Sequence, residues 1–340
     1  HPTSPITNFS FAPIYFSLTK RRKIMQSIAI IGSGICGLTI ANGLKDTKAE
    51  VTVFDQGRRP GGRAASRTIE GCVFDHGAPA IPNKVAEHFV TDTRLSSEQW
   101  LLDKSSTHCP IGGVANFGRD IADGLKVQQS TTILGCQRNG EDFFLSLSEG
   151  RSVSSIDTLI LTAPPLQSAA LIQEIEPTLG EELRETCKMS PAWVVLFKIA
   201  DQFSTENYAF APSEIITNVR HEHTKPGRKS SSLGSWFVAE CSSEWSVENL
   251  ERSPEWVSMA VLEGLRADLG ENFPVASSFA HRWRYASTQD PIGSNYLHND
   301  NRSLWITGDW CLGNGIQSAH TSGLSVVNEL LTDMGHGSFS

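Results

Sequence analysis

The sequence predicts an α/β protein in which a parallel β-sheet with flanking helices is interleaved with a second, β-rich domain. A short apolar run, Ser27–Ile31, ends at a glycine, and a helical pattern and a second apolar run follow it. This is the order of a βαβ unit. The same strand–glycine–helix order returns after Leu304–Thr307. Seven of the eight tryptophans lie at or after residue 193, and this shift in composition indicates a second subdomain.

The elements of the first unit follow from apolar spacing. Ser27–Ile31 and Glu50–Phe54 are short apolar runs typical of buried parallel strands, and Ile35–Lys45 has small and apolar residues at helical spacing. Further predicted elements are a Gly- and Arg-rich loop at Gln56–Arg67, a loop and helix at Gly112–Leu125, strands at Thr131–Leu134, Ile156–Leu161 and Trp193–Ile199, a polar helix at Glu174–Cys187, an exposed polar loop at Arg220–Ser232, and a helix at Gln317–Leu331.

Charge and cysteine content narrow the class of protein. The 340 residues carry a formal net charge of -8, and after residue 24 there are 25 basic against 37 acidic residues. An acidic body argues against nucleic acid and anionic membranes as partners. No apolar run approaches the ~20 residues of a membrane span.

The seven cysteines form no CxxC pair, which indicates free thiols in a reducing compartment. His221, His223 and Cys241 match no zinc spacing, so we expect no metal.

Residues 1–24 have a composition of their own. They lack acids, are rich in Ser and Thr, and end in a basic cluster just before Met25. This fits an organellar transit segment, and it equally fits a native start at Met25. We expect the segment to be flexible, and the protein to be cytoplasmic, or organellar if residues 1–24 are a transit segment.

The glycine motif after the first strand carries the strongest chemical signal. Gly32-Ser33-Gly34-Ile35-Cys36-Gly37 follows a strand and opens a helix. In such a loop the first glycine allows a tight turn, the second admits a pyrophosphate, and the third lets helix and strand pack. Asp55 ends the next strand, where a carboxylate can bind a ribose 2′-hydroxyl and repels a 2′-phosphate. The sequence therefore predicts a Rossmann-type dinucleotide site.

Two further motifs favour FAD over NAD at this site. Gly61-Gly62-Arg63 lies shortly after Asp55, where glycines let the chain run close to a flavin's pyrophosphate or ribityl and the arginine offsets phosphate charge. Gly308 and Asp309 follow the last strand, and the carboxylate suits a ribityl hydroxyl. The helix beginning near Gln317 would direct its positive end at the isoalloxazine ring. We therefore expect FAD, bound non-covalently.

At this level of detail the chain resembles the renalase family within the flavin amine-oxidase superfamily. The matching stretches are SIAIIGSGICGL, VFDQGRRPGGRAASR, FDHGA (Phe74–Ala78), GGVANFGRDIADGL, LTAPPLQSAALI, HRWRYA (His281–Ala286) and LWITGDWCLGNGIQSAHTSGL. The resemblance implies a Rossmann-type, GR2-like FAD-binding domain interleaved with a mixed-β substrate domain. It further implies oxidase chemistry that takes hydride from 2- and 6-dihydro isomers of NAD(P)H, passes it to flavin and then to O2, and yields peroxide. The expected partners are thus a reduced small molecule and O2.

The resemblance also implies roles for individual residues. Trp283 and Tyr285 would line the pocket over the flavin ring, Ile133 would meet the adenine, and Gly315, Ile316 and Gln317 would lie near the pyrimidine edge. The full cofactor set is Gly32, Ser33, Gly34, Ile35, Cys36, Gly37, Asp55, Gln56, Gly61, Gly62, Arg63, Gly77, Ala78, Ile133, Gly308, Asp309, Gly315, Ile316 and Gln317.

The chain departs from the family around the substrate. Pro79-Ala80-Ile81-Pro82 replaces an aromatic or polar run, the segment 79–111 is shorter than usual, and His320 stands where a large aromatic is common. His320 is a candidate base, and Trp283 and Tyr285 are candidates for stacking a substrate ring. The departures keep two alternatives open: a flavin amine oxidase or desaturase with another substrate, and a non-catalytic FAD-binding redox module.

The domain division follows from these assignments. We expect residues 25–80, 112–172 and 286–334 to form the FAD-binding domain, and residues 81–111 and 173–285 to form the substrate domain.

Overall fold

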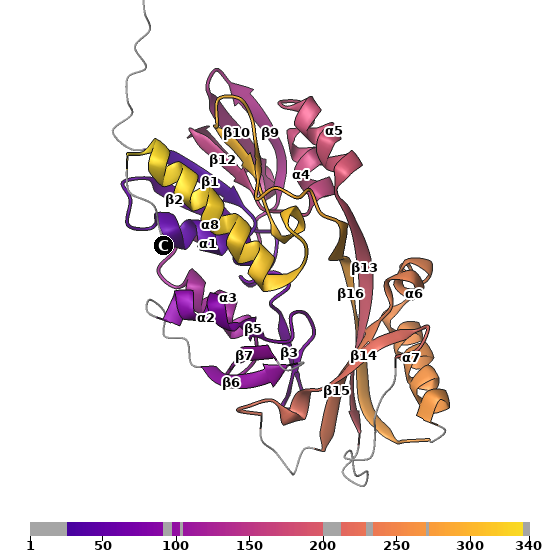
Figure 1. Cartoon of the computed structure of the whole chain (residues 1–340). Coiled ribbons are helices and arrows are strands. Elements are labelled where there is room, and N and C mark those ends of the chain that lie inside the picture. The colour runs from indigo at the N-terminus through magenta and orange to yellow at the C-terminus, as the bar shows by residue number, and fades with distance from the viewer. Residues whose placement is uncertain are drawn as a thin grey trace, which may run out of the picture.

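The computed structural model describes residues 26–90, 97–102, 105–199, 212–228, 234–269 and 272–335 (Figure 1). The predictions for residues 1–24 lie outside the described residues. No helix among the described residues is long and apolar enough to cross a membrane.

A six-stranded sheet forms the centre of the fold, in the order β17–β18–β12–β1–β2–β8. Neighbouring strands are parallel except β17, which runs antiparallel to β18. The register places Ile31 beside Phe54 and Leu161, so the parallel strands end at one edge. The strands are β1 (Ser27–Ile31), β2 (Glu50–Phe54), β8 (Val127–Gln128), β12 (Thr158–Leu161), β17 (Leu297–His298) and β18 (Leu304–Ile306).

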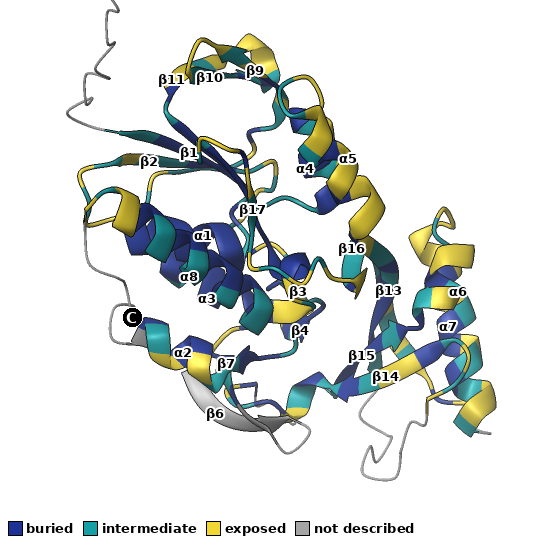
Figure 2. Cartoon of the chain, turned by 45° about the horizontal axis from the view of Figure 1, so that its top comes forward, coloured by how far each residue is buried: buried dark blue, intermediate teal, exposed yellow. Residues whose placement is uncertain are grey.

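Both faces of this sheet are covered, as an apolar parallel sheet requires. Side chains alternate along β1: Ile28 and Ile30 join a core with helices α1 and α8, while Ala29 and Ile31 join a core on the opposite face. All ten residues of α1 are buried, and in Figure 2 exposed residues lie on the outer side of α5. The covering elements are α1 (Ile35–Leu44), α2 (Asn83–Val90), α3 (Ala115–Ala122), α4 (Pro165–Ile172), α5 (Pro177–Thr186), α8 (Gly315–Asp333), and the sheet of β9 (Ile133–Asn139), β10 (Asp142–Leu147) and β11 (Ser152–Ile156).

A second, antiparallel sheet has the order β14–β15–β13–β16. Trp193 and Val195 face a core closed by helix α7, whereas Val194 and Leu196 face Phe74 of strand β4. The sheet therefore stands between its own helices and the rest of the chain, as Figure 1 shows. Its elements are β13 (Lys188–Ile199), β14 (Ile216–His221), β15 (Ser235–Cys241), β16 (Val275–Asp290), α6 (Ser243–Glu248) and α7 (Pro254–Leu269).

Short strands connect the two parts. A hairpin of β3 (Ser66–Ile69) and β4 (Cys72–Asp75) leads into the small sheet β5–β7–β6, made of Ile81–Pro82, Ser105–Pro110 and Ser97–Leu102. The predicted fold class is confirmed: the molecule is α/β, with a parallel Rossmann-like sheet.

Most predicted elements form, with shifted ends. The strands Ser27–Ile31 and Glu50–Phe54 have the predicted bounds. The predicted strand Ile156–Leu161 is instead two strands of different sheets, β11 and β12, divided at Asp157. At the break, Asp157 Oδ2 accepts a hydrogen bond from the Ser27 amide of β1 at 2.9 Å. The other differences are extensions or trims at the ends of β9, β13, α3, α5 and α8.

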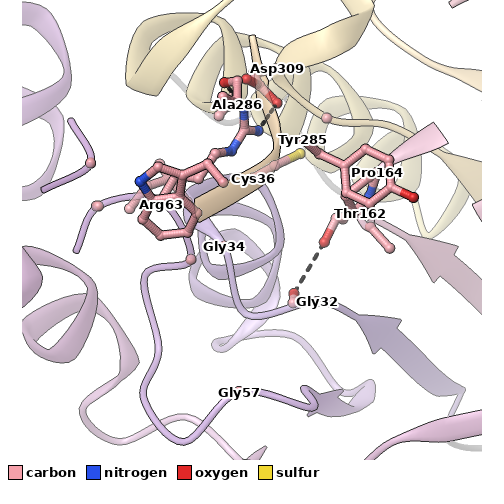
Figure 3. A pocket seen from close by; sticks show the side chains of 18 of the residues that line it. Gly32, Gly34, Cys36, Gly57, Arg63, Thr162, Pro164, Tyr285, Ala286 and Asp309 are labelled. Atoms are coloured by element: carbon pink, nitrogen blue, oxygen red, sulfur yellow. Dashed lines mark hydrogen bonds and ion pairs between the residues drawn. The ribbon is translucent and has the colours of Figure 1, made fainter. Parts of the chain in front are cut away.

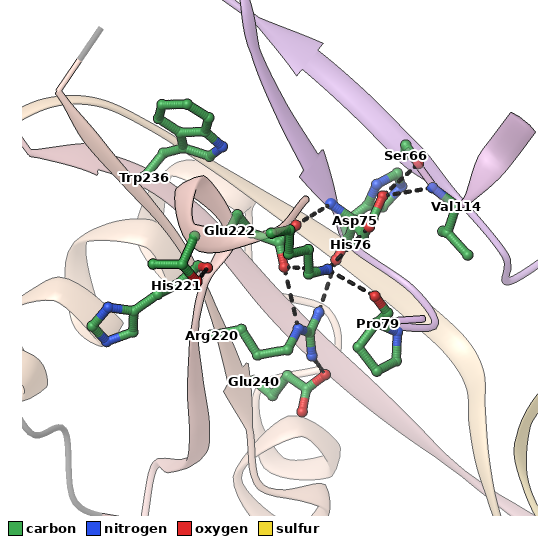
Figure 4. Close-up of polar contacts among 12 residues, drawn as sticks. Ser66, Asp75, His76, Pro79, Val114, Arg220, His221, Glu222, Trp236 and Glu240 are labelled. Carbon is green, nitrogen blue, oxygen red and sulfur yellow. Dashed lines mark hydrogen bonds and ion pairs between the residues drawn. The ribbon is translucent and has the colours of Figure 1, made fainter. Parts of the chain in front are cut away.

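The prediction of an exposed loop at Arg220–Ser232 is wrong at its first two residues, which belong to β14, and at its four buried charged residues, whereas Thr224 and Gly227 are exposed. Arg220 lies in strand β14, which ends at His221, and Arg220, Glu222, Lys225 and Arg228 are all buried. Their charges are satisfied by one another and by Asp75 of β4 (Figure 4). Polar composition predicted exposure here because the compensating carboxylate lies far away in the sequence. Residues 229–233 lie outside the described residues.

Candidate functional site

A cavity of about 1160 Å³ opens where the parallel strands end. Ile31, Phe54, Thr162 and Gly308 lie at the ends of β1, β2, β12 and β18, and all four line it. Ligands of open α/β sheets bind at such strand ends. Pockets for drug-sized ligands measure ~300–1,000 Å³, so this cavity is large enough for a long ligand and a second molecule.

The first glycine loop is shaped by contacts that exclude side chains. Gly32 has φ +112°, and a Cβ there would lie 2.5 Å from Thr162 Oγ1, which hydrogen-bonds the Gly32 carbonyl (Figure 3). A Cβ on Gly37 would lie 2.0 Å from the Gly32 carbonyl oxygen. By contrast, a Cβ on Gly34 would meet nothing within 4 Å. Two of the glycines are therefore needed for packing, and the middle one borders open space in the cavity.

Helix α1 presents its N-terminus to that space. Gly34 is the N-cap, no side chain caps the helix, and its first turn holds no acid. The first N–H groups of a helix have no intrahelical partner and carry a partial positive charge. An anionic phosphate at this place would satisfy them.

The second glycine loop packs directly on the first. Gly61 donates its N–H to the Ser33 carbonyl at 2.8 Å, and Gly34 and Gly61 form a parallel bridge. Gly61 and Gly62 have φ values of +109° and +57°, which favour glycine. A Cβ on Gly118 of α3 would lie 2.4 Å from the Gly61 Cα. The loop is thus held between α3 and the glycine motif.

Asp55 organises the strand end beside this loop. Its Oδ2 accepts hydrogen bonds from Ser33 N at 2.5 Å and Ser33 Oγ at 2.8 Å, and Oδ1 accepts from Gly57 N at 2.6 Å. The carboxylate lines the cavity, and Oδ1, which accepts a single hydrogen bond, keeps acceptor capacity. It can therefore accept a hydroxyl hydrogen bond while it fixes the loop.

Arg63 and Asp309 join distant parts of the chain at the cavity wall. Arg63 Nη2 lies 2.5 Å from Asp309 Oδ1, and Nη1 donates to the Ala286 carbonyl at 2.8 Å (Figure 3). The second oxygen of Asp309, Oδ2, is buried and has no hydrogen-bond partner among the described residues. A buried unpaired acceptor is costly, so a ligand that donates a hydrogen bond to this oxygen would be stabilised in the cavity.

Helix α8 also begins at the cavity. Its N-cap residue, Asn314, hydrogen-bonds the backbone N–H and carbonyl of Thr288 in β16 instead of capping the helix. Gly315 has φ +86°, and a Cβ there would meet nothing within 4 Å. The N-terminus of α8 is therefore open to a ligand, and its first turn holds no acid.

Together these features fit the predicted cofactor. Two open helix N-termini, two loops whose glycines leave the backbone accessible, and one unpaired acceptor at Asp309 suit a molecule with phosphates, hydroxyls and an electron-accepting ring.

Most of the predicted residues lie around this one cavity. Trp283 and Tyr285 line it from β16. Ser33 does not line it, because it is fully buried behind Asp55, and neither do Gly37 and Gln317. The predicted cofactor residues that line it are Gly32, Gly34, Ile35, Cys36, Asp55, Gln56, Gly61, Gly62, Arg63, Gly77, Ala78, Ile133, Gly308, Asp309, Gly315 and Ile316.

His320 lies elsewhere. It is buried on α8, with its ring 4.7 Å from that of His88 and 5.5 Å from that of Phe89, both on α2. Burial, with a smaller effect of His88, lowers the pKa of His320 to about 4. The structure therefore places this candidate base in the packing between α2 and α8 and not on the cavity wall.

Two cysteines beside the cavity have protonated thiols. Burial raises the pKa of Cys36 far above its ordinary value and that of Cys311 to about 12. Thiols of this kind are poor nucleophiles. All seven cysteines belong to the described residues, where each is buried and unpaired. No cluster of metal-ligating side chains occurs within the described ranges.

Sequence reasoning missed several wall residues. His76 lines the cavity within the FDHGA stretch, and its ring stacks on Trp283 with centroids 5.6 Å apart. Burial, and to a lesser degree His281, lowers the pKa of His76 to about 4, so the ring is neutral near pH 7. Glu240 and Thr162 are among the other polar wall residues that were missed. The FDHGA motif could have drawn attention to His76, whereas no local pattern marks Glu240.

Comparison with known proteins agrees with this geometry. Residues 30–92 match the family model described as an NAD(P)-binding Rossmann-like domain. Among solved structures, the chain is similar to one described as a putative protoporphyrinogen oxidase from Exiguobacterium sp. 255-15, with a TM-score of 0.72 and 14% identity. The match covers 91% of this chain and 99% of that chain. At this identity the likeness establishes a shared fold and nothing finer.

Proposed function

We propose that this chain is an FAD-dependent oxidoreductase, and specifically an oxidase of the renalase type that takes hydride from a reduced nicotinamide-type ring. The observation that carries the proposal is that the dinucleotide-binding elements and the aromatic wall of the second sheet border the same cavity. A cofactor bound along the glycine loops can thus meet a planar substrate held by Trp283 and Tyr285.

Different residues would bind different parts of the cofactor. The N-terminus of α1 and the loop at Gly61–Arg63 would hold the phosphates, and Asp55 the adenosine ribose. Asp309 would bind a ribityl hydroxyl through its unpaired oxygen, which Arg63 holds in place. The positive end of α8 would lie at the ring, where it favours the negative charge of the reduced form.

The reaction would need orientation more than acid–base catalysis. When bound, FAD supplies a two-electron acceptor that takes hydride from the dihydropyridine carbon, leaves a pyridinium, and returns both electrons to O2 as peroxide. The chain's part is to stack the substrate ring and exclude water. No base is required, in keeping with the weak basicity of His76, whose pKa is lowered to about 4, and with the position of His320 away from the cavity wall.

The proposal is tested by anaerobic mixing of the purified holoprotein with 2- or 6-dihydroNAD(P). Rapid bleaching of the flavin absorbance, followed by peroxide formation when O2 is admitted, is the expected result. Failure of both isomers to bleach the flavin refutes the renalase-type substrate.

A second candidate is a flavin amine oxidase or desaturase with another substrate. It is favoured by the shared fold with a protein described as a putative protoporphyrinogen oxidase and by the altered segment after Ala78. Flavin bleaching by an amine or an apolar hydrocarbon, without bleaching by dihydronicotinamides, would select it. A chain that makes no peroxide with any reductant would instead be a non-catalytic redox module.

A further inference from the structure

One face of the antiparallel sheet forms a continuous wall of the cavity. Val194 of β13 pairs directly with Glu240 of β15, and Ala192 of β13 pairs with Trp283 of β16. Directly opposed residues on antiparallel strands project to the same face. All four line the cavity, so a row from Trp283 through Ala192 and Val194 to Glu240 crosses this wall.

The row has an aromatic end and a floor of small residues. Trp283 is fixed, because its Nε1 donates to the His76 carbonyl at 2.8 Å, and Tyr285 lies two residues further along β16. Ala192 and Val194 carry the two smallest side chains of the row. They leave room for a flat ring between Trp283 and the opposite end.

The opposite end of the row is the carboxylate of Glu240, which an ion pair with Arg220 holds in place. Glu240 Oε1 pairs with Arg220 Nη1, and the side chain of Arg220 is only 5% exposed. The other two nitrogens of Arg220 are also engaged, by Glu222 Oε1 at 3.5 Å and the Asp75 carbonyl at 2.8 Å. Figure 4 shows Arg220 lying between Glu240 and the buried ion cluster, which consists of Asp75, Glu222, Lys225 and Arg228 together with Arg220 itself. Arg220 therefore cannot turn toward a ligand, and it fixes the direction in which Glu240 points.

The second oxygen of Glu240 remains available. The Glu240 side chain is 33% exposed, and Oε2 has no partner in the part of the chain that the structure describes. An ionised carboxylate accepts hydrogen bonds but donates none. This end of the row thus accepts an N–H or O–H group and repels a second carboxylate.

We propose that Glu240 is a specificity-determining residue that accepts a hydrogen bond from the carboxamide N–H₂ of the substrate ring, with Arg220 as its positioning residue. The inference rests on the proposed function, because it takes the ring to be a nicotinamide, and it adds the group that selects this ring. A ring on the Ala192–Val194 floor has Trp283 at one side and Glu240 at the other. The carboxamide then fixes which ring carbon faces the flavin.

The test compares two oxidised dinucleotides that differ in this group alone. NAD⁺ carries the carboxamide, and its deamido analogue, nicotinic acid adenine dinucleotide, carries a carboxylate. Each is titrated into oxidised holoprotein, and binding is read from the perturbation of the flavin absorbance. The wild type should bind NAD⁺ tighter by about tenfold or more, since hydrogen bonds to charged groups contribute strongly and like charges repel.

Three variants separate a specificity role from a structural one. Glu240→Gln keeps the size of the side chain but removes the charge, so the ratio of the two affinities should fall toward one. Arg220→Lys should weaken NAD⁺ binding while flavin content, measured by absorbance, stays unchanged. Glu248→Gln, a carboxylate on the exposed side of α6, is the matched control and should keep the wild-type ratio.

The outcomes distinguish this proposal from the function it rests on. An affinity ratio near one in the wild type, an unchanged ratio in Glu240→Gln, or no perturbation by either dinucleotide overturns the role of Glu240. If dihydroNAD(P) bleaches the flavin while the ratio is near one, the proposed function stands and this inference fails. If the ratio depends on Glu240 but no dihydro isomer bleaches the flavin, the hydride step fails and the subsite stands.

Discussion

The buried ion cluster should respond strongly to the loss of a single charge, and Glu222→Gln is the sharpest change. Glu222 is fully buried and contacts Lys225 at 2.8 Å, Arg220 at 3.5 Å and Arg228. Gln keeps the volume and can still accept the hydrogen bond from the Asp75 amide. The negative charge and one acceptor oxygen are lost, and the cations Arg220, Lys225 and Arg228 then face only the carboxylates Asp75 and Glu240.

The expected cost follows from that imbalance. Removing one partner from a buried ion pair destabilises a protein by about 3–5 kcal/mol. Since each kcal/mol lowers Tm by about 2 °C in large domains, Tm should fall by about 6–10 °C. Thermal unfolding of wild type and variant is followed by tryptophan fluorescence at the same FAD concentration, because a bound ligand shifts Tm.

Two further variants make the reasoning refutable. Glu248→Gln on the surface should change stability by less than about 0.5 kcal/mol. The double variant Glu222→Gln/Lys225→Met restores the balance of charges, so it should lose less than the sum of the two single variants. The coupled buried network would be refuted if Glu222→Gln had the same Tm as the Glu248→Gln control. It would also be refuted if the stability losses of the two single variants were strictly additive in the double variant.

Three other substitutions probe the cofactor site and its surroundings. Gly118→Ala places a Cβ 2.4 Å from the Gly61 Cα, so the purified protein should retain less FAD by absorbance, whereas Gly135→Ala, with open space around it, should retain the wild-type amount. Asp309→Asn removes the charge that pairs with Arg63, so the Kd for FAD, measured by fluorescence titration of the apoprotein, should rise about tenfold or more. In His320→Leu, a buried group with a lowered pKa is removed, and the unfolding free energy should depend less on pH between 6.5 and 4.

The sign of the last prediction follows from proton linkage. The folded protein holds His320 neutral down to about pH 4, whereas the unfolded chain binds a proton near pH 6.5. Stability is therefore full above pH 6.5 and declines as pH falls toward 4. An equally steep decline in His320→Leu would contradict this role, equal FAD retention in Gly118→Ala would contradict the packing argument, and an unchanged Kd in Asp309→Asn would contradict the ribityl contact.

Asp75 of the ion cluster loses its contribution to stability at a lower pH than His320 does. Burial alone would raise the pKa of Asp75, but Lys225, Arg228 and hydrogen bonds from Ser66 and Val114 outweigh it and hold that pKa below its ordinary value. The stability that Asp75 contributes is thus present above about pH 4 and is lost as pH falls toward the folded-state pKa. The cluster should therefore resist the mild acid in which His320 already costs stability.

The elements around the glycine motif could be predicted because their signals are local. Ser27–Ile31, Gly32 and Asp55 reveal a strand, a turn and a strand end by their own spacing, and the structure places them as expected. Their proximity to Asp309 was also predictable, since a strand and a helix start near it repeat the first unit.

The parts that the sequence did not predict depend on partners far along the chain. The Arg220–Arg228 segment looks solvated because its charges find Asp75 only in the folded protein, at a sequence separation of 150 for Lys225. Glu240 becomes a wall residue only through its register with Val194. Composition and periodicity describe one segment at a time, so such pairings are outside their reach.

The ion pair between Arg63 and Asp309 has a consequence for the order in which parts of the site form during synthesis. The two residues are 246 positions apart, and ribosomes add about 5–20 residues per second, so Asp309 is synthesised roughly 12–50 s after Arg63. Until then strand β12, which lies beside β1, has no β18 on its other side, and α8 does not yet cover α1. If FAD binds as proposed, its full site forms only late in synthesis, and a chain truncated before α8 would lack both Asp309 and the helix that covers α1.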